Sequence, residues 1–157
     1  MNKTKSFTQS PSSFSHDIQA RIYVADTDFS GVVYHARYLE FLERGRSEFL
    51  RDMGLSNNEL ISDSQGEKLF FVVRHMDIIF SKPAILDDLL TIKTSLQCVQ
   101  GARFFMDQVI LRNEIILIKA KVEIALINQE AKPRRLPKNL FSSAFFKSDI
   151  GTEVPKE

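Results

Sequence analysis

The spacing of hydrophobic residues predicts one strand, then one long helix, then a series of strands. In residues 14–24 apolar side chains alternate with polar ones, which is typical of a strand with one buried face. Residues 35–53 space their apolar positions three and four apart, as on one face of an amphipathic helix. Gly54 follows, and glycine readily adopts the left-handed conformation that ends a helix. A period of two then returns in four segments: residues 70–80, 90–99, 103–112 and 116–126.

The order of these elements predicts a layered fold. The turns between the predicted strands are short, which favours an antiparallel, meandering sheet. A single amphipathic helix must bury its apolar face on that sheet, so the expected fold class is α+β. Cys98 falls on the inward-facing positions of its strand, and we expect a small core residue there.

One helix covers only one side of a long sheet, which bears on assembly. The remaining edges and apolar surface favour pairing with a partner sheet. We therefore expect a dimer or a larger assembly. The alternative is a monomer whose N-terminal leader folds over the open edge.

The size of the chain fits one globular domain. We divide its 157 residues into a disordered leader (1–13), a domain (14–145) and a flexible C-terminal tail (146–157). The 43% of apolar and 26% of charged residues are an ordinary globular mix.

Charge and cysteine content exclude several function classes. The 21 Lys and Arg nearly balance the 20 Asp and Glu, so we expect no nucleic-acid partner. Cys98 is the only cysteine, which excludes an internal disulfide and a zinc cluster of Cys ligands. The three histidines show no ligand spacing, so we expect no metal. No run approaches the ~18 apolar residues of a membrane span, and the first residues do not form a signal-peptide core. We expect no membrane insertion and a cytoplasmic location.

The segment ADTDFSGVVYHARYLEFLERGRSEFL carries the candidate chemistry. Asp26 and Asp28 lie in the loop before the helix, and Gly31 to His35 lead into it. A helix N-terminus offers unpaired N–H groups, which can stabilise the oxyanion of a tetrahedral intermediate. A carboxylate beside them can attack as a nucleophile or activate water. Together these groups suit acyl transfer or hydrolysis, although acids near helix N-termini are often only caps.

A longer motif points to a family. The pattern R-I-x4-T-D-x2-G-V-V-x-H-x2-Y begins at Arg21 and ends at Tyr38. It resembles the 4-hydroxybenzoyl-CoA thioesterase family. The pattern F-x-E-x2-R, from Phe41 to Arg46, resembles that family's bacterial YbgC branch of acyl-CoA thioesterases, which is associated with the Tol-Pal system. The match continues through FFVVRHMDIIFSKPAILDDLL to KPRRLP and covers most of residues 21–137.

The resemblance implies a hotdog fold, in which a curved antiparallel sheet of about five strands wraps one long central helix. It implies a homodimer or homotetramer that hydrolyses acyl-CoA at the dimer interface. The second acid, at Asp28, is then the catalytic one, and the backbone N–H of His35 polarises the thioester carbonyl. Whether the carboxylate attacks directly or activates water stays open. CoA is part of the substrate, so no cofactor is expected.

The candidate site residues follow from this resemblance and from residue chemistry. Asp28 and His35 are the catalytic candidates. The substrate-binding candidates are Gly31, Val32, Val33, Tyr34, Arg74, Arg134 and Arg135. The arginines suit CoA phosphates because guanidinium groups make bidentate, charge-assisted contacts, although a strand charge and a solvated basic tail are the alternatives.

Three further residues are open to a structural interpretation. The side chain of His35 is a general base, a substrate contact or an interface packing group. For Asp26 we favour a structural role that shapes the loop. For Glu43 we favour an ion pair with Arg44 or Arg46.

Two other functions remain open. A hotdog hydratase or dehydratase would place a proline-containing turn before its histidine, and residues 28–35 contain no proline. A non-catalytic module would bind acyl-CoA or acyl carrier protein and dock on an envelope complex such as Tol-Pal. The intact Asp28 segment argues against a pure binding role, because binding needs no carboxylate beside the carbonyl.

Overall fold

The computed structural model describes residues 14–55, 66–136 and 140–141. The predicted leader (1–13) and tail (146–157) lie outside the described residues. The elements follow the predicted order: β1 (Ser15–Arg21), a short 3-10 helix η1 (Val24–Asp26), α1 (Arg37–Asp52), β2 (Leu69–Phe80), β3 (Leu89–Gln100), β4 (Arg103–Arg112) and β5 (Ile115–Asn128).

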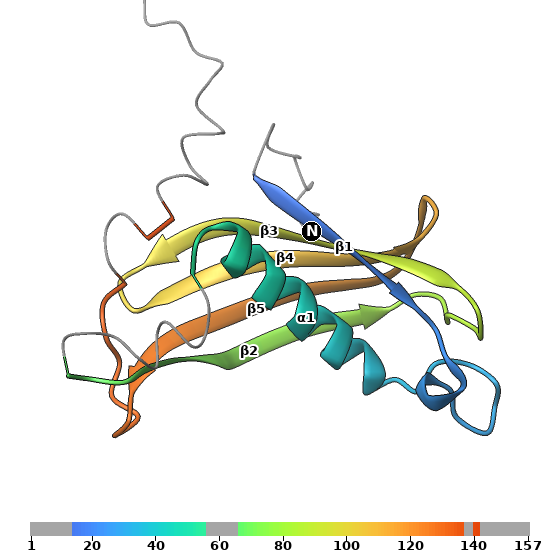
Figure 1. The fold of residues 1–157 in the computed structure, drawn as a ribbon, viewed down its shortest axis with the longest axis horizontal. Coiled ribbons are helices and arrows are strands. Elements are labelled where there is room, and N and C mark those ends of the chain that lie inside the picture. The colour runs from blue at the N-terminus through green and yellow to red at the C-terminus, as the bar shows by residue number, and fades with distance from the viewer. Residues whose placement is uncertain (1–13, 56–65, 137–139, 142–157) are drawn as a thin grey trace, which may run out of the picture.

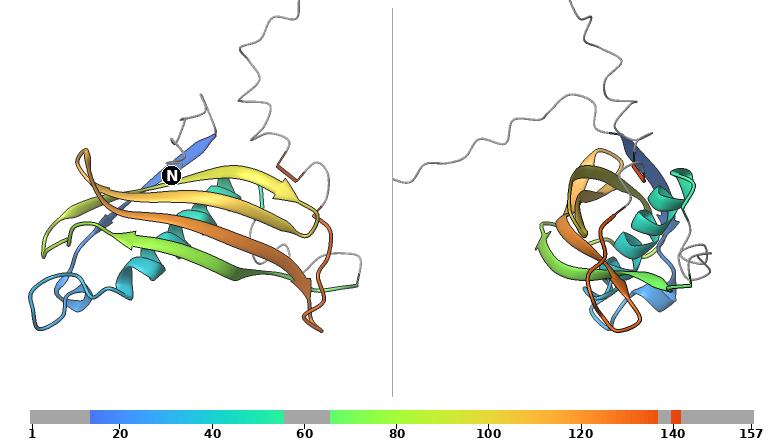
Figure 2. Two further views of the ribbon diagram at one scale, coloured as in Figure 1. Left: turned by 180° about the vertical axis from the view of Figure 1, so that it is seen from behind. Right: turned by 90° about the vertical axis from the view of Figure 1, so that its left-hand side faces the viewer.

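The strands form one antiparallel sheet that curves around the helix. Their order is β1-β3-β4-β5-β2. Helix α1 lies across the inner face of this sheet, and the outer face has no helix over it among the described residues (Figures 1 and 2). This arrangement confirms the predicted α+β class and the hotdog architecture.

The predicted meander is right for β3–β4–β5 and wrong for β2. Two-residue turns join β3 to β4 and β4 to β5, whereas β2 pairs with β5 rather than with β3. The reason is the longer connection of residues 81–88, which does not fold back as a hairpin. The end of this connection is tied to Ile22, the residue after β1. Asp87 N–H donates to the Ile22 carbonyl at 3.0 Å, and Ile22 N–H donates to the Asp88 carbonyl at 2.9 Å. The chain therefore crosses from β2, at one edge of the sheet, to β3, which lies next to the other edge strand, β1.

The helix packs on the sheet through a close contact at Gly45. A Cβ added there would lie 2.7 Å from Ile92 Cγ2 and 2.8 Å from Thr94 Oγ1. Around this contact the buried face of α1 is large and apolar: Tyr38, Phe41, Leu42, Phe49 and Leu50. The one charged member is Arg46, which donates to Gln108 Oε1 at 3.0 Å.

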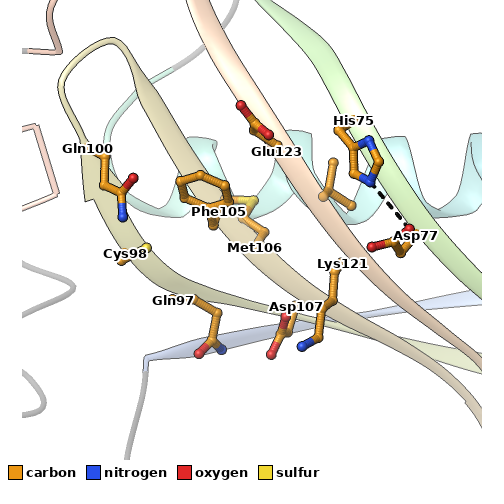
Figure 3. A pocket seen from close by; sticks show the side chains of 11 residues that line it. His75, Asp77, Gln97, Cys98, Gln100, Phe105, Met106, Asp107, Lys121 and Glu123 are labelled. Carbon is orange, nitrogen blue, oxygen red and sulfur yellow. Dashed lines mark hydrogen bonds and ion pairs between the residues drawn. The ribbon is translucent and has the colours of Figure 1, made fainter.

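Cys98 is not a core residue, contrary to the prediction. The β3–β4 register shifts between Leu96 and Cys98, so the alternation of faces along β3 breaks there. Cys98 is half-buried and lines a hollow of about 470 Å³ together with His75, Phe105 and Glu123. In Figure 3 this hollow lies over the strands, on the side of the sheet away from α1. It belongs to the outer face and does not include Asp28.

Candidate active site at the start of the helix

The segment between β1 and α1 is a narrow turn held by backbone hydrogen bonds. Asp28 N–H donates to the Val32 carbonyl at 3.0 Å, and Thr27 forms a bridge with Val33. The turn is braced from outside, because Val33 N–H donates to the Ala84 carbonyl at 2.9 Å. The position of residues 27–33 is therefore set by backbone contacts.

Gly31 closes this turn with a positive φ of 82°. Its N–H donates to the Asp28 carbonyl at 3.0 Å. A Cβ built on Gly31 meets nothing within 4 Å, so the glycine is needed for its conformation, not for space within the chain.

The Asp28 carboxylate is held by Ser30. Both the backbone N–H (2.8 Å) and the hydroxyl of Ser30 donate to Asp28 Oδ1. The hydrogen bond from the Ser30 hydroxyl lowers the pKa of Asp28 most, and the bond from the Ser30 amide lowers it further. Partial burial raises this pKa, and the electrostatic effect of His35 lowers it. Asp28 is therefore a carboxylate at neutral pH.

The backbone N–H of His35 lies in the same segment between β1 and α1 as Asp28. The first helical residue is Arg37, whose N–H donates to the Tyr34 carbonyl at 2.8 Å. The observed helix thus begins two residues later than predicted, and His35 lies in the turn before it. In the described part of the chain, the N–H of His35 has no acceptor. Its ring lies 4.7 Å from that of Tyr34 and 6.3 Å from that of Phe80.

Asp26 has the contacts of a structural residue. Its carboxylate accepts from Tyr23 N–H at 2.8 Å and lies 3.3 Å from Arg37 Nε. Its carbonyl accepts from Tyr34 N–H at 2.9 Å. These bonds join the loop to the start of α1, as expected for a residue that shapes the loop.

The candidate arginines lie far from Asp28 within one chain. Arg134 forms an ion pair with Glu67 at 2.7 Å, and Arg74 lies 3.7 Å from Glu123. The segment of Arg134 and Arg135 is at one end of the sheet, and the turn of Asp28 is at the other (Figures 1 and 2). The chain thus brings together Asp28 and residues 31–35 but not the arginines.

The predicted Glu43 ion pair is wrong. No arginine of the described segments lies within 4.0 Å of this carboxylate, which accepts from Ser47 Oγ at 2.8 Å. Arg46 donates a buried hydrogen bond to Gln108, and the Arg44 guanidinium lies over the Phe41 ring, 5.7 Å from its centroid. Burial of one partner and an aromatic contact of the other outweigh a surface ion pair of small energy.

Sequence reasoning missed Ser30 and the contact that the Tyr38 hydroxyl makes. Ser30 follows Asp28 by two positions, a spacing at which an aspartate often bonds the backbone two residues on. The Tyr38 hydroxyl accepts from Ala84 N–H at 2.9 Å, which joins α1 to the brace of the turn. That second contact spans 46 positions and has no signal in the sequence.

The described residues contain neither a metal-binding cluster nor a membrane-spanning helix. No group of His, Cys, Asp and Glu within these ranges could hold a metal ion. No helix within them is both long and apolar enough to span a bilayer.

The fold defines a class of protein. A curved antiparallel sheet wrapped around one long helix is the hotdog fold of the thioesterases to which this chain is similar. The chain belongs to the Thioesterase superfamily, whose family model matches residues 30–119.

Relatives agree with this assignment. The chain is 41% identical over 121 residues to the acyl-CoA thioesterase YbgC of Haemophilus influenzae, covering 76% of this chain and 87% of the relative. It is 72% identical to a probable thioesterase from Bartonella henselae, with a TM-score of 0.77 over 79% of this chain and all of the other. A 1,4-dihydroxy-2-naphthoyl-CoA thioesterase from Synechocystis is 26% identical, with a TM-score of 0.74 over 89% of this chain and all of the other. This protein is therefore an acyl-CoA thioesterase, a thioester hydrolase.

Proposed function

We propose that the Asp28 carboxylate and the His35 backbone amide hydrolyse the thioester of an acyl-CoA. The observation that supports this most directly is their shared turn, in which the pKa of the Asp28 carboxyl is lowered and the N–H of His35 has no acceptor among the described residues. The His35 amide is the donor for the carbonyl oxygen. A donor of this kind contributes roughly a hundred- to a thousand-fold to the rate.

Two chemical routes are compatible with this geometry. In one, Asp28 attacks the carbonyl carbon, CoA leaves as a thiolate, and water hydrolyses the resulting acyl-aspartyl anhydride. In the other, Asp28 takes a proton from water, whose oxygen attacks the carbonyl carbon directly. In both routes negative charge develops on the carbonyl oxygen beside the His35 amide. Both end in a free acid and CoA.

We further propose a dimer that forms along β2. This strand is an edge of the sheet, and no other described strand pairs with its outer side. Several of its large apolar residues are exposed, among them Val73 at 48% and Ile79 at 61%. An exposed edge of 12 residues is a template for pairing with another strand.

A two-fold axis at β2 explains the distant arginines. Antiparallel pairing of two identical strands sets the Phe80 end of one copy beside the Leu69 end of the other. Phe80 lies next to His35, whereas Arg134 is paired with Glu67 just before Leu69. Arg134 and Arg135 would thus face the reactive turn of the second copy, and Arg74, near the middle of β2, would lie close to the axis. There they would meet the phosphates of CoA.

The test is a thiol-release assay over acyl-CoAs from short aliphatic to aryl to long chain. Asp28→Asn keeps the size and the turn contacts but is a poor nucleophile and base. We expect it to lose about a hundred-fold or more in kcat. The control is Asp52→Asn, the same chemical change at the exposed far end of α1. Equal activity of Asp28→Asn and the native protein would refute the proposed role of Asp28.

The same panel tests the donor and the rival functions. An acyl carrier protein substrate in the panel distinguishes the two thioester carriers. We propose a cytoplasmic location for the enzyme, which suits an acyl-CoA substrate. Docking on an envelope complex such as Tol-Pal is compatible with this location. If no thioester is hydrolysed but acyl-CoA raises the melting temperature, the chain is a binding module instead.

A further inference from the structure

We propose that Ser30 is a positioning residue that fixes one oxygen of the Asp28 carboxylate and leaves the other as the reacting oxygen. This inference rests on the proposed function of Asp28. Ser30 donates two hydrogen bonds to Oδ1, one from its amide and one from its hydroxyl. No donor or cation of the described residues bonds to Oδ2. The two oxygens are therefore chemically different before any substrate binds.

The hydroxyl of Ser30 is not needed to form the turn. Asp28 is already held by its own backbone, with its N–H on the Val32 carbonyl and its carbonyl on Gly31 N–H, both at 3.0 Å. The bridge from Thr27 to Val33 closes the same turn. The Ser30 side chain is exposed, and among the described residues its hydroxyl bonds to Asp28 Oδ1 alone. Its removal should therefore change the carboxylate and leave the backbone in place.

The Ser30 hydroxyl acts on both orientation and charge. Two donors on Oδ1 restrict rotation of the carboxylate, and Oδ2 is left to attack the thioester carbon or to accept a proton from water. Orientation matters because a small misplacement of a reacting group is costly in rate. The same two bonds favour the ionised form, so Asp28 stays charged to lower pH.

Few other groups set the charge state of Asp28. Besides Ser30, the titratable side chain that acts on the pKa of Asp28 is His35, in the turn before α1. Asp26, on the same loop, is neutralised by Arg37 at 3.3 Å. The segment at Ala84 and Ile85, which braces the turn, contributes no charged side chain at those two positions. A change in the titration of Asp28 on removing the Ser30 hydroxyl is therefore attributable to that hydroxyl.

The experiment compares Ser30→Ala with Ser30→Thr, which retains a hydroxyl. For Ser30→Ala we expect kcat to fall about tenfold, with KM within twofold of the native value. The acid limb of its kcat/KM profile should move to higher pH, because the carboxylate loses a donor. Ser30→Thr should restore most of kcat and the native acid limb. The melting temperature of both should stay within about 2 °C of the native protein, as for exposed substitutions.

The matched control is Ser47→Ala. Ser47 also donates its hydroxyl to a carboxylate, that of Glu43 at 2.8 Å, but lies on the helix away from the turn. It should leave kcat and the pH profile unchanged. If Ser30→Ala has native kcat and a native acid limb, Ser30 has no positioning role. If Ser30→Thr is as impaired as Ser30→Ala while both are folded, the hydroxyl is not the active group and the inference also fails.

A measurement without substrate separates this inference from the proposed function. Carbon-13 NMR titration of the Asp28 carboxyl, assigned with Asp28→Asn, reports the Ser30 contact directly. We expect a higher pKa of Asp28 in Ser30→Ala than in the native protein, and an unchanged pKa would overturn the inference. If the pKa rises but Asp28→Asn keeps full thioesterase activity, the contact stands, and the proposed function of Asp28 and the catalytic role of Ser30 are both refuted.

Discussion

The contact between Gly45 and the sheet gives a quantitative prediction for stability. Substitution Gly45→Ala adds one methyl group at a place where the helix is buried against β3. That carbon would lie 2.7 Å from Ile92 Cγ2, 2.8 Å from Thr94 Oγ1 and 3.1 Å from Gln108 Nε2. Ordinary carbon contacts are about 3.5–4.0 Å, so the helix would have to lift by roughly 0.8 Å. The first two atoms are on branched side chains of a strand and cannot swing aside.

The expected cost follows from three contributions. Overpacking of a well-packed core costs about 1–3 kcal/mol. The displaced Gln108 amide, which bonds to Thr94 Oγ1 (2.8 Å) and the Leu42 carbonyl (2.9 Å), would lose a buried partner at about 1–3 kcal/mol. Alanine recovers about 1 kcal/mol through its higher helix propensity. Together these contributions give a loss of about 1–5 kcal/mol in the free energy of unfolding, with a central value of about 3 kcal/mol.

The assay is denaturant unfolding with thermal melting as a second readout. For a chain of this length the central value of about 3 kcal/mol corresponds to a melting temperature lower by roughly 6–12 °C. Ser47→Ala, two positions along the same helix, is the control and should change the free energy by less than about 0.5 kcal/mol. A Gly45→Ala protein as stable as the native one would show that the helix is not pressed against β3 at this point.

Three further predictions concern the brace, the charged end and the edge of the sheet. Tyr38→Phe should lower the free energy of unfolding by about 1–3 kcal/mol and reduce kcat, because the buried Ala84 N–H loses its acceptor at 2.9 Å. Thermal melting measures the loss of stability, and thiol release measures kcat. Hydrogen bonds from Arg134 lower the pKa of Glu67, so its contribution to stability is present above its ordinary pKa and lost as pH falls through the lowered one. The difference in melting temperature between the native protein and Glu67→Gln should therefore shrink on acidification, and a constant difference would contradict it. Val73→Asp should yield a folded monomer with little activity by light scattering and thiol release, whereas a native protein that is already monomeric would refute the proposed dimer.

The period of the hydrophobic pattern predicted the elements well because each element buries one face. The predicted strand of residues 103–112 matches β4 at both ends, and Gly54 ends the helix with a φ of 82°. These features depend on neighbours in sequence, which a local pattern contains. The proposed catalytic turn was found for a similar reason, since residues 26–35 are contiguous.

The errors arise where distant segments compete for the same group. β2 pairs with β5 because a long connection crosses the sheet, and no local pattern distinguishes that from a hairpin. Cys98 changes face because of a bulge, which shifts alternation by one residue. Arg46 bonds to Gln108, 62 positions away, instead of to a neighbour on its helix. In each case the contact that decides is non-local.

The position of α1 connects stability with the proposed chemistry. The N–H of His35 can point at a thioester only if the start of the helix is held in place. At the turn, the ion pair between Asp26 and Arg37 holds it. Along the helix, it is held by the hydrogen bond from Ala84 N–H to the Tyr38 hydroxyl and by the close packing at Gly45. A variant that lifts α1 at Gly45 should therefore lose activity as well as stability, whereas Ser30→Ala should lose activity with its stability retained. These opposite patterns distinguish residues that place the amide from the residue that orients the carboxylate.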